Sequence, residues 1–391
     1  MRASNRQARG GAIRLFGYLS FVPFFVLTAG CGGSPSGTGM GPTDVARARV
    51  SLERYRHIPR FTQPGPQFNA KVALKGKTIF EIPVSSEVPF VAAVERGMKQ
   101  AAAVVGAKLV VFPNQGSPTE WQQGISAAIA RHADAITLFA QNPALLGPQI
   151  AQATKAGTPV IVLRTTGDGD ACQSDPNGKI YGTACVPGPF EQAGRLIADH
   201  VVEATNGKAN ALVITSSEAP SSVPLMRGLR DEFRRRCPPC RVTTVDVPIV
   251  EWATRIPTEV QSRLVGDPKI DYIIPIYDSM SQFVVAAIRT ARADGRVKVA
   301  TFNGTPFVLK MVEDGDVVAM DVGENLSWLG WAAMDQAFRV VAGVSPVKSE
   351  HTALRVFDDG NVAAAGRPPG YDAGYGSSYI EGYKRLWRVG N

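Results

Sequence analysis

The chain has 391 residues and a formal net charge of +8 at neutral pH. Residues 1–30 contain four arginines and no acidic residue, so the rest carries about +4, which gives no argument for nucleic-acid binding. The rest is also longer than one hydrophobic core usually holds, so two lobes are expected. No later apolar run approaches the length of a membrane span.

The first 31 residues have the order of an export signal. A basic region over 2–14 precedes an apolar run over 15–27, and Ala29 and Gly30 stand directly before Cys31. The stretch from Leu27 to Cys31 resembles a bacterial lipobox, in which the cysteine becomes the first mature residue and carries lipid. We therefore expect a signal peptide over 1–30 and an extracytoplasmic protein anchored to the cell membrane through Cys31. The alternative is an ordinary signal peptide with an incidental cysteine.

Residues 31–76 are expected to form a tether and linker. The Gly/Ser-rich start suits a flexible tether, a short helix is predicted over 44–57, and prolines then interrupt regular structure. From residue 77 short apolar strands alternate with helices. The strands are predicted at 78–84, 108–112, 135–139 and 159–163, and the helices at 90–105, 120–131 and 146–156. Such a pattern is typical of a parallel sheet covered by helices on both faces.

The same pattern restarts after a Gly/Asp-rich loop over 167–182. Strands are predicted at 211–215, 242–247, 272–276, 297–302 and 317–322, and helices at 190–205, 223–236, 254–264, 279–294 and 326–341. A Pro/Gly-rich tail follows. The fold class is therefore α/β, with two doubly wound parallel-sheet lobes.

Four cysteines follow Cys31, and an even number in an exported chain indicates disulfides. Three pairings are possible, and the local one, Cys172–Cys185 with Cys237–Cys240, is the simplest. The second pair lies at the predicted C-terminal end of a helix, where the helix dipole disfavours a thiolate, so a structural disulfide is preferred to a redox motif. Two cysteines and scattered histidines do not make a zinc site, and no metal or other cofactor is expected.

Four segments resemble the type I periplasmic binding proteins of ABC importers, in their ribose/galactose-type sugar-binding branch. Residues 82–91 (IPVSSEVPFV) resemble the first strand and ligand loop, and residues 160–164 (VIVLR) resemble the fourth strand with its polar end. Residues 275–278 (PIYD) resemble a segment that usually reads N-D. Residues 301–306 (TFNGTP) resemble the F-D-G-T-P loop and are the most specific match. The resemblance covers about residues 77–347.

This resemblance implies two lobes joined by a three-segment hinge, with crossovers near 184–187, 322–325 and 343–347. The lobes would be 77–186 plus 324–345, and 187–323 plus 346–391 with the tail. A monomer would capture a small polar ligand, a sugar or polyol, and deliver it to an ABC permease and its ATPase. The alternative is a membrane-tethered sensor that presents such a ligand to a receptor. No catalytic motif is present, so an enzyme is not expected, nor a nucleic-acid partner, nor membrane contact other than the lipid anchor.

Ligands of doubly wound sheets bind at the carboxyl ends of the strands. The side chains expected there combine aromatic faces for sugar C–H groups with polar groups for hydroxyls: Ser85, Ser86, Glu87, Phe90, Gln141, Asn142, Arg164, Ser221, Ser222, Glu251, Trp252, Tyr277, Asp278 and Asn303.

Several of these residues have a structural alternative. Phe90 can be a core residue, Trp252 an interlobe packing residue, Asp278 a helix N-cap and Asn303 a turn residue. Val88, Arg164, Tyr277 and Asn303 stand where the family usually has other residues. The identity of the ligand therefore cannot be carried over from the resemblance.

Overall fold

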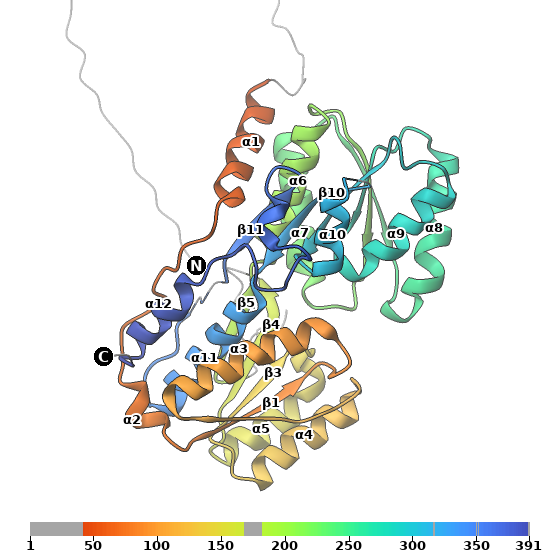
Figure 1. Ribbon diagram of the computed structural model, residues 1–391. Coiled ribbons are helices and arrows are strands. Elements are labelled where there is room, and N and C mark those ends of the chain that lie inside the picture. Colours follow the sequence, from red (N-terminus) through yellow and green to blue (C-terminus); the bar gives the residue numbers. More distant parts are fainter. Residues whose placement is uncertain (1–41, 168–181, 316, 349, 351, 390–391) are drawn as a thin grey trace, which may run out of the picture. The chain divides into compact units, whose positions relative to one another are not determined.

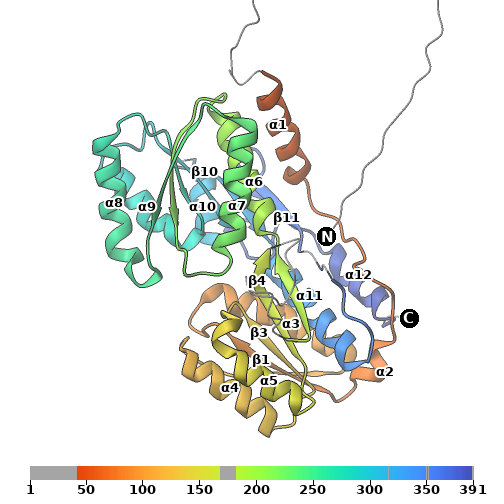
Figure 2. The same ribbon diagram turned by 180° about the vertical axis from the view of Figure 1, so that it is seen from behind.

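The first lobe is built on a parallel sheet in the order β2-β1-β3-β4-β5. We describe a computed structural model, which covers residues 42–389 except 168–181, 316, 349 and 351. The strands are β1 (Thr78–Pro83), β2 (Lys108–Val111), β3 (Ala135–Phe139), β4 (Val160–Gly167) and β5 (Ala184–Gly188). Helices α3 (Pro89–Val105) and α11 (Leu326–Val341) cover one face, and α4 (Pro118–Ala130) and α5 (Gly147–Lys155) cover the other (Figures 1 and 2).

Alternating side chains of these strands supply two separate cores. Ile79 packs in the cluster under α3 and α11, whereas its neighbour Phe80 packs in the cluster under α4 and α5. Because both faces of the sheet are buried, strand residues of either parity are apolar. This is why the strands read as continuous apolar runs in the sequence.

The second lobe has a sheet in the order β11-β10-β9-β8-β6-β7, in which only the β10–β11 pairing is antiparallel. Its strands are β6 (Asn210–Thr215), β7 (Arg241–Asp246), β8 (Tyr272–Pro275), β9 (Lys298–Asn303), β10 (Val318–Glu324) and β11 (Leu354–Asp358). Its helices are α6 (Phe190–Ala204), α7 (Ser222–Arg236), α8 (Trp252–Gly266), α9 (Asp278–Thr290) and α10 (Pro306–Glu313). The predicted α/β class with two parallel-sheet lobes is confirmed.

Two terminal segments add to these lobes. The predicted N-terminal helix is present as α1 (Pro42–Arg56), which packs on α6 and β11, and the short α2 (Ala70–Leu74) follows it. The Pro/Gly-rich tail, for which no element was predicted, contains β11, a 3-10 helix η3 (Val362–Ala365) and α12 (Ser378–Leu386). Glycine and proline at 366–376 dominate the composition there and conceal the short elements on either side.

Helix α12 belongs to the first lobe through an aromatic cluster. The rings of Trp331 and Trp387 stack with centroids 5.2 Å apart, and Trp387 Nε1 donates to Asp335 Oδ1 at 2.6 Å. Tyr383 meets Phe61, from the segment after α1, edge-on at 4.9 Å. Residues 346–391, expected with the second lobe, are therefore divided, since β11 joins the second sheet and α12 packs on α11. The remaining boundaries stay predictions.

The disulfide Cys237–Cys240 is present directly after α7, as predicted. Cys185 on β5 is also disulfide-bonded, and its predicted partner Cys172 lies outside the described residues. Cys31 and the expected signal peptide lie outside them as well. Within the described part of the chain, no helix is long and apolar enough to cross a membrane.

Candidate functional site

The loop after β1 is held by a residue that follows β2. Asn114 Nδ2 donates to the carbonyl of Pro83 at 2.9 Å, and the Asn114 amide donates to Ser86 Oγ at 3.2 Å. Ser85 Oγ accepts from the Glu87 amide at 3.2 Å. The two serines therefore shape the loop, while the Glu87 side chain is exposed.

Phe90 and Gln141 stand at the carboxyl end of the first sheet. Phe90 is half-buried in the first turn of α3 and meets Phe139, at the end of β3, edge-on at 5.8 Å. Gln141 Nε2 donates to the carbonyl of Ile82 at 2.7 Å, and its buried Oε1 has no partner among the described residues. Asn142 instead caps the 3-10 helix η1 (Pro143–Leu146).

Arg164 connects β4 with the hinge and the second lobe. Its backbone adopts φ +58°, and its side chain is only 6% exposed. The guanidinium lies 4.8 Å from the ring centroid of Phe190 and 5.9 Å from that of Phe302, both in the second lobe. It forms an ion pair with Glu324 at the end of β10.

Glu324 also contacts the segment that leads into β11, because its second carboxylate oxygen accepts from the Thr352 hydroxyl. Burial lowers the pKa of Arg164 to about 10, and nearby Tyr277 opposes this shift. The guanidinium therefore remains charged at neutral pH, compensated by one carboxylate and two aromatic rings.

Tyr277 presents a fixed hydroxyl at the end of β8. Its oxygen lies 2.7 Å from Ser221 Oγ and 3.0 Å from Ser222 Oγ. Ser222 Oγ in turn donates to the carbonyl of Ser216 at 2.6 Å. Burial raises the pKa of Tyr277, so the phenol is neutral. Because the Ser222 proton goes to Ser216, the phenol donates to Ser222 Oγ, and its oxygen can still accept a hydrogen bond.

Asp278 supports the loop that follows β9. It is fully buried, and its Oδ2 accepts from the Thr305 amide at 2.7 Å and from the Thr305 hydroxyl at 2.6 Å. The N-cap position of α9 is taken by Tyr277, so Asp278 is not an N-cap. Its carboxylate instead fixes the loop over 303–305, in which Asn303 is half-buried.

A second buried carboxyl, Asp321 on β10, faces the same loop. Its Oδ1 accepts from the Gly304 amide at 3.1 Å. Burial raises the pKa of Asp278 to about 6. Burial, and next the charge of Asp278, raise the pKa of Asp321 well above its ordinary value. The two carboxyls therefore retain a proton at a pH where exposed aspartates are ionised.

Glu251 and Trp252 have local partners. Glu251 is partly exposed and pairs with Arg255 at 3.1 Å, one turn away. Trp252 Nε1 donates to the carbonyl of Val247 at 3.2 Å, and its ring packs against the core of the second lobe. Both contacts fit a structural role at the start of α8.

Four residues around this site were absent from the predicted ligand set: Phe190, Phe302, Asp321 and Glu324. Of these, only Glu324 lies in a predicted crossover, the one over 322–325. An aspartate inside the apolar strand 318–324 was a signal for a buried functional carboxyl. The pairing of Arg164 with Glu324 had no such signal, because 160 residues separate them.

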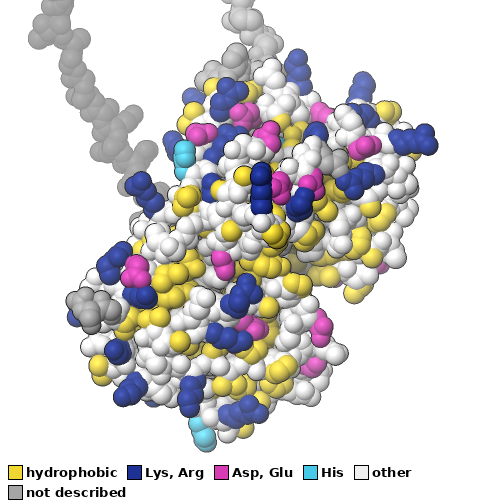
Figure 3. Space-filling model, in the orientation of Figure 1, with side chains coloured by type: hydrophobic (Ala, Val, Ile, Leu, Met, Phe, Trp, Pro, Cys, Tyr) yellow, Lys and Arg dark blue, Asp and Glu magenta, His cyan; other side chains and the backbone are white. Residues whose placement is uncertain are grey.

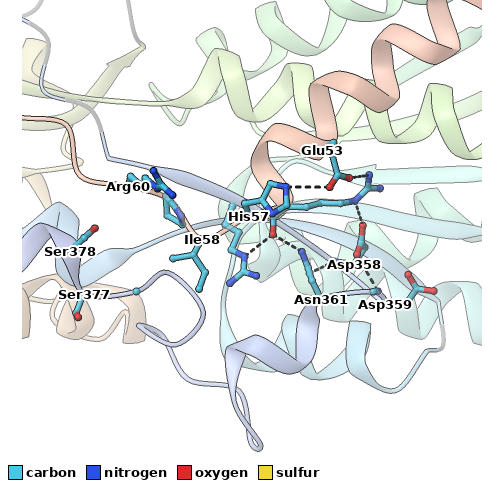
Figure 4. A pocket seen from close by; sticks show the side chains of 14 residues that line it. Glu53, His57, Ile58, Arg60, Asp358, Asp359, Asn361, Ser377 and Ser378 are labelled. Carbon is cyan, nitrogen blue, oxygen red and sulfur yellow. Dashed lines mark hydrogen bonds and ion pairs between the residues drawn. The ribbon is translucent and has the colours of Figure 1, made fainter.

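A cavity of about 1150 Å³ lies elsewhere, between the end of α1, the turn after β11 and residues 376–378. Glu53, His57 and Asp358 are among the side chains that line it (Figure 4). Arg56 joins two of them, since its Nε donates to Asp358 Oδ2 at 2.7 Å and its Nη1 pairs with Glu53 at 3.3 Å. None of the predicted ligand residues lines this cavity. On the face shown in Figure 3, lysine and arginine side chains are scattered among acidic ones rather than gathered into a single basic patch.

A comparison with protein-family models identifies the family to which the chain belongs. The family model described as "Periplasmic binding protein domain" matches residues 80–345. The chain belongs to the periplasmic binding protein family. The predicted resemblance to its type I members is confirmed, and a solute-binding protein of this kind is not an enzyme.

Solved structures agree on the fold. A glucose-galactose binding protein from Geobacillus stearothermophilus is 20% identical, with a TM-score of 0.64 over 73% of this chain and 99% of that one. The myo-inositol binding protein of Caulobacter is 22% identical, with a TM-score of 0.64 over 74% and 96%. A periplasmic ribose ABC transporter protein from Conexibacter woesei is 21% identical, with a TM-score of 0.64 over 76% and 95%. No curated protein matches the chain significantly.

Proposed function

We propose that this chain is an extracytoplasmic solute-binding lipoprotein that captures a sugar or polyol between its lobes and delivers it to an ABC import permease. It acts as a monomer, is anchored through Cys31 and needs no cofactor. The observation that carries the proposal is the set of aromatic and hydrogen-bonding side chains at the carboxyl ends of both sheets. Phe90, Gln141, Arg164, Tyr277 and Asn303 are the proposed ligand contacts.

The chemistry of this set suits a polyhydroxylated ligand. Gln141 Oε1 is a buried acceptor without a partner among the described residues, and the Tyr277 phenol oxygen can accept from a ligand hydroxyl. Phe90 offers an apolar face for C–H groups. Asp278, Ser85 and Ser86 hold the loops that carry these contacts. The similar solved structures include proteins named for glucose-galactose, myo-inositol and ribose, which is the same chemical class.

A ligand panel tests the proposal. Thermal shifts should be measured with glucose, galactose, ribose, myo-inositol, allitol and glycerol, and each positive result should be confirmed by calorimetry. A ligand at a hundred times its dissociation constant stabilises the folded state by about 2.7 kcal/mol, which shifts the melting temperature by several degrees. A panel in which no sugar or polyol shifts the melting temperature would contradict the proposed ligand class.

Delivery to a permease has a separate test. Deleting the gene should abolish uptake of the radiolabelled ligand by cells, and restoring it should recover uptake. Normal uptake together with a lost cellular response to the ligand would instead identify a membrane-tethered sensor.

A further inference from the structure

The C-terminal tail passes from the second lobe back to the first. Strand β11 pairs with β10 in the second sheet, whereas α12 packs on α11 in the first lobe. The tail lies beyond residue 345, where the family match ends. It is therefore a connection between the lobes in addition to the three crossovers expected from the family.

Tyr375 is the contact of this tail with the second lobe. It is fully buried and meets Phe357 of β11 edge-on at 5.4 Å. Its hydroxyl lies against Gly304 and Gly323, which stand at the carboxyl ends of β9 and β10, and a Cβ at either glycine would overlap the hydroxyl oxygen. The tyrosine thus packs directly against the loop over 303–305 that carries a proposed ligand contact.

Asp372 is the contact of the tail with the first lobe. Its Oδ1 accepts from the Ser327 amide at 3.2 Å, and its Oδ2 accepts from the Ser327 hydroxyl at 2.8 Å. Ser327 lies in the first turn of α11, where the Asn325 side chain already caps Trp328. Asp372 therefore fixes the first-lobe end of the second crossover.

These two contacts lie on either side of one hinge segment. The second crossover passes from Gly323 in β10 to Ser327 in α11, with only Asn325 between the strand and the helix. Residues 372–375 touch both of its ends, and three residue steps span at most about 10 Å. Arg355 Nη1 donates to the carbonyl of Gly374, which fixes the backbone between the two contacts.

We propose that residues 372–375 are a splint along the second crossover, which restricts its bending and, through Tyr375, positions the loop over 303–305. Hinge closure is absorbed by a few backbone angles at the ends of elements. Bending between Gly323 and Ser327 would have to break the Asp372–Ser327 bonds or move Tyr375 off the two glycines. Tyr375 is thus a positioning residue, and that role rests on the proposed function because the loop bears Asn303.

Hydrogen exchange in the full-length mature protein tests the splint without a ligand. Asp372→Ala removes the first-lobe contact and does not touch the loop, and Asp372→Asn is a milder variant that keeps one acceptor. We expect the Gly304 and Thr305 amides to exchange about tenfold faster in Asp372→Ala, because Tyr375, which packs against their loop, becomes free to move. Small-angle scattering should show a larger radius of gyration for the same variant. Asp359→Ala, an exposed substitution on the same tail, is the matched control.

The outcomes separate the splint from the ligand proposal. Unchanged exchange at Gly304 and Thr305 in a folded Asp372 variant, with unchanged scattering, would overturn the splint. Exchange in the first-lobe strands and far-UV circular dichroism report whether each variant is folded. If the ligand panel fails while exchange rises as expected, the splint stands and the proposed function fails. If a ligand binds and the exchange rates do not change, the proposed function stands and the splint fails.

Discussion

Replacing Asp321 by asparagine should stabilise the protein above neutral pH and reduce the dependence of its stability on pH. Asp278 Oδ1 and Asp321 Oδ2 are buried and have no hydrogen-bond donor among the described residues. A retained proton therefore stabilises the pair. The amide of an asparagine at 321 supplies a permanent donor to Asp278, and its carbonyl oxygen can still accept from the Gly304 amide.

The size of the effect follows from the shift at Asp278. Its pKa is raised from 3.8 to about 6, with burial as the largest cause. A shift of about two units corresponds to roughly 3 kcal/mol. Because the folded state binds this proton more tightly than the unfolded state, the stability is fully present below about pH 4 and is lost as the pH rises through 6. After the weaker hydrogen bond to Gly304 is subtracted, Asp321→Asn should gain about 1–2 kcal/mol at pH 8.

The assay is urea unfolding of both proteins at pH 5, 6.5 and 8. The difference in unfolding free energy should increase with pH and favour the variant at pH 8. Asp359→Asn, which changes an exposed aspartate of the tail, should show no such trend. A variant that is less stable than the wild type at pH 8, or a pH dependence that the substitution leaves unchanged, would refute the shared-proton reasoning.

Three further predictions concern stability and location. Trp387→Ala should lower the unfolding free energy by about 3–5 kcal/mol in urea titrations, because it leaves a cavity beside Trp331 and removes the donor to Asp335 Oδ1; a loss below 1 kcal/mol would contradict this packing. Cys240→Ser should cost about 2 kcal/mol through loss of a short closed loop, again by urea titration, whereas an unchanged midpoint would show that the disulfide contributes nothing. Cys31→Ala should move the protein from the membrane fraction to the soluble one, and unchanged partitioning would exclude the lipid anchor.

The sequence predicted the elements between residues 77 and 341 well, because strands buried on both faces and amphipathic helices leave strong periodic signals. The predicted helix 326–341 coincides with α11, and the strand 135–139 with β3. Short elements without such periodicity were missed, namely β5, α10 and the elements of the tail. Their positions depend on pairing and packing with distant residues.

The site was predicted in outline only. The strand ends gave Phe90, Gln141 and Tyr277, because the carboxyl edge of a parallel sheet follows from topology. The partners of Arg164 are set by tertiary structure, as Glu324 and Phe302 come from strands of the other lobe. Trp252 was predicted as an aromatic face for the ligand, and the sequence did not reveal that its indole donates to Val247 and that its ring packs on the core.

The most direct test of the account is a calorimetric titration of the best ligand from the panel into the wild type, Tyr277→Phe, Asn303→Ala and the control Asp359→Ala. The account predicts a 1:1 complex with micromolar affinity, which corresponds to about −8 kcal/mol. Each of the two site variants should lose about 1–3 kcal/mol, because a ligand hydroxyl is left unpaired, and the control should bind like the wild type. Equal affinity of all four proteins would place the ligand elsewhere and contradict the proposed site.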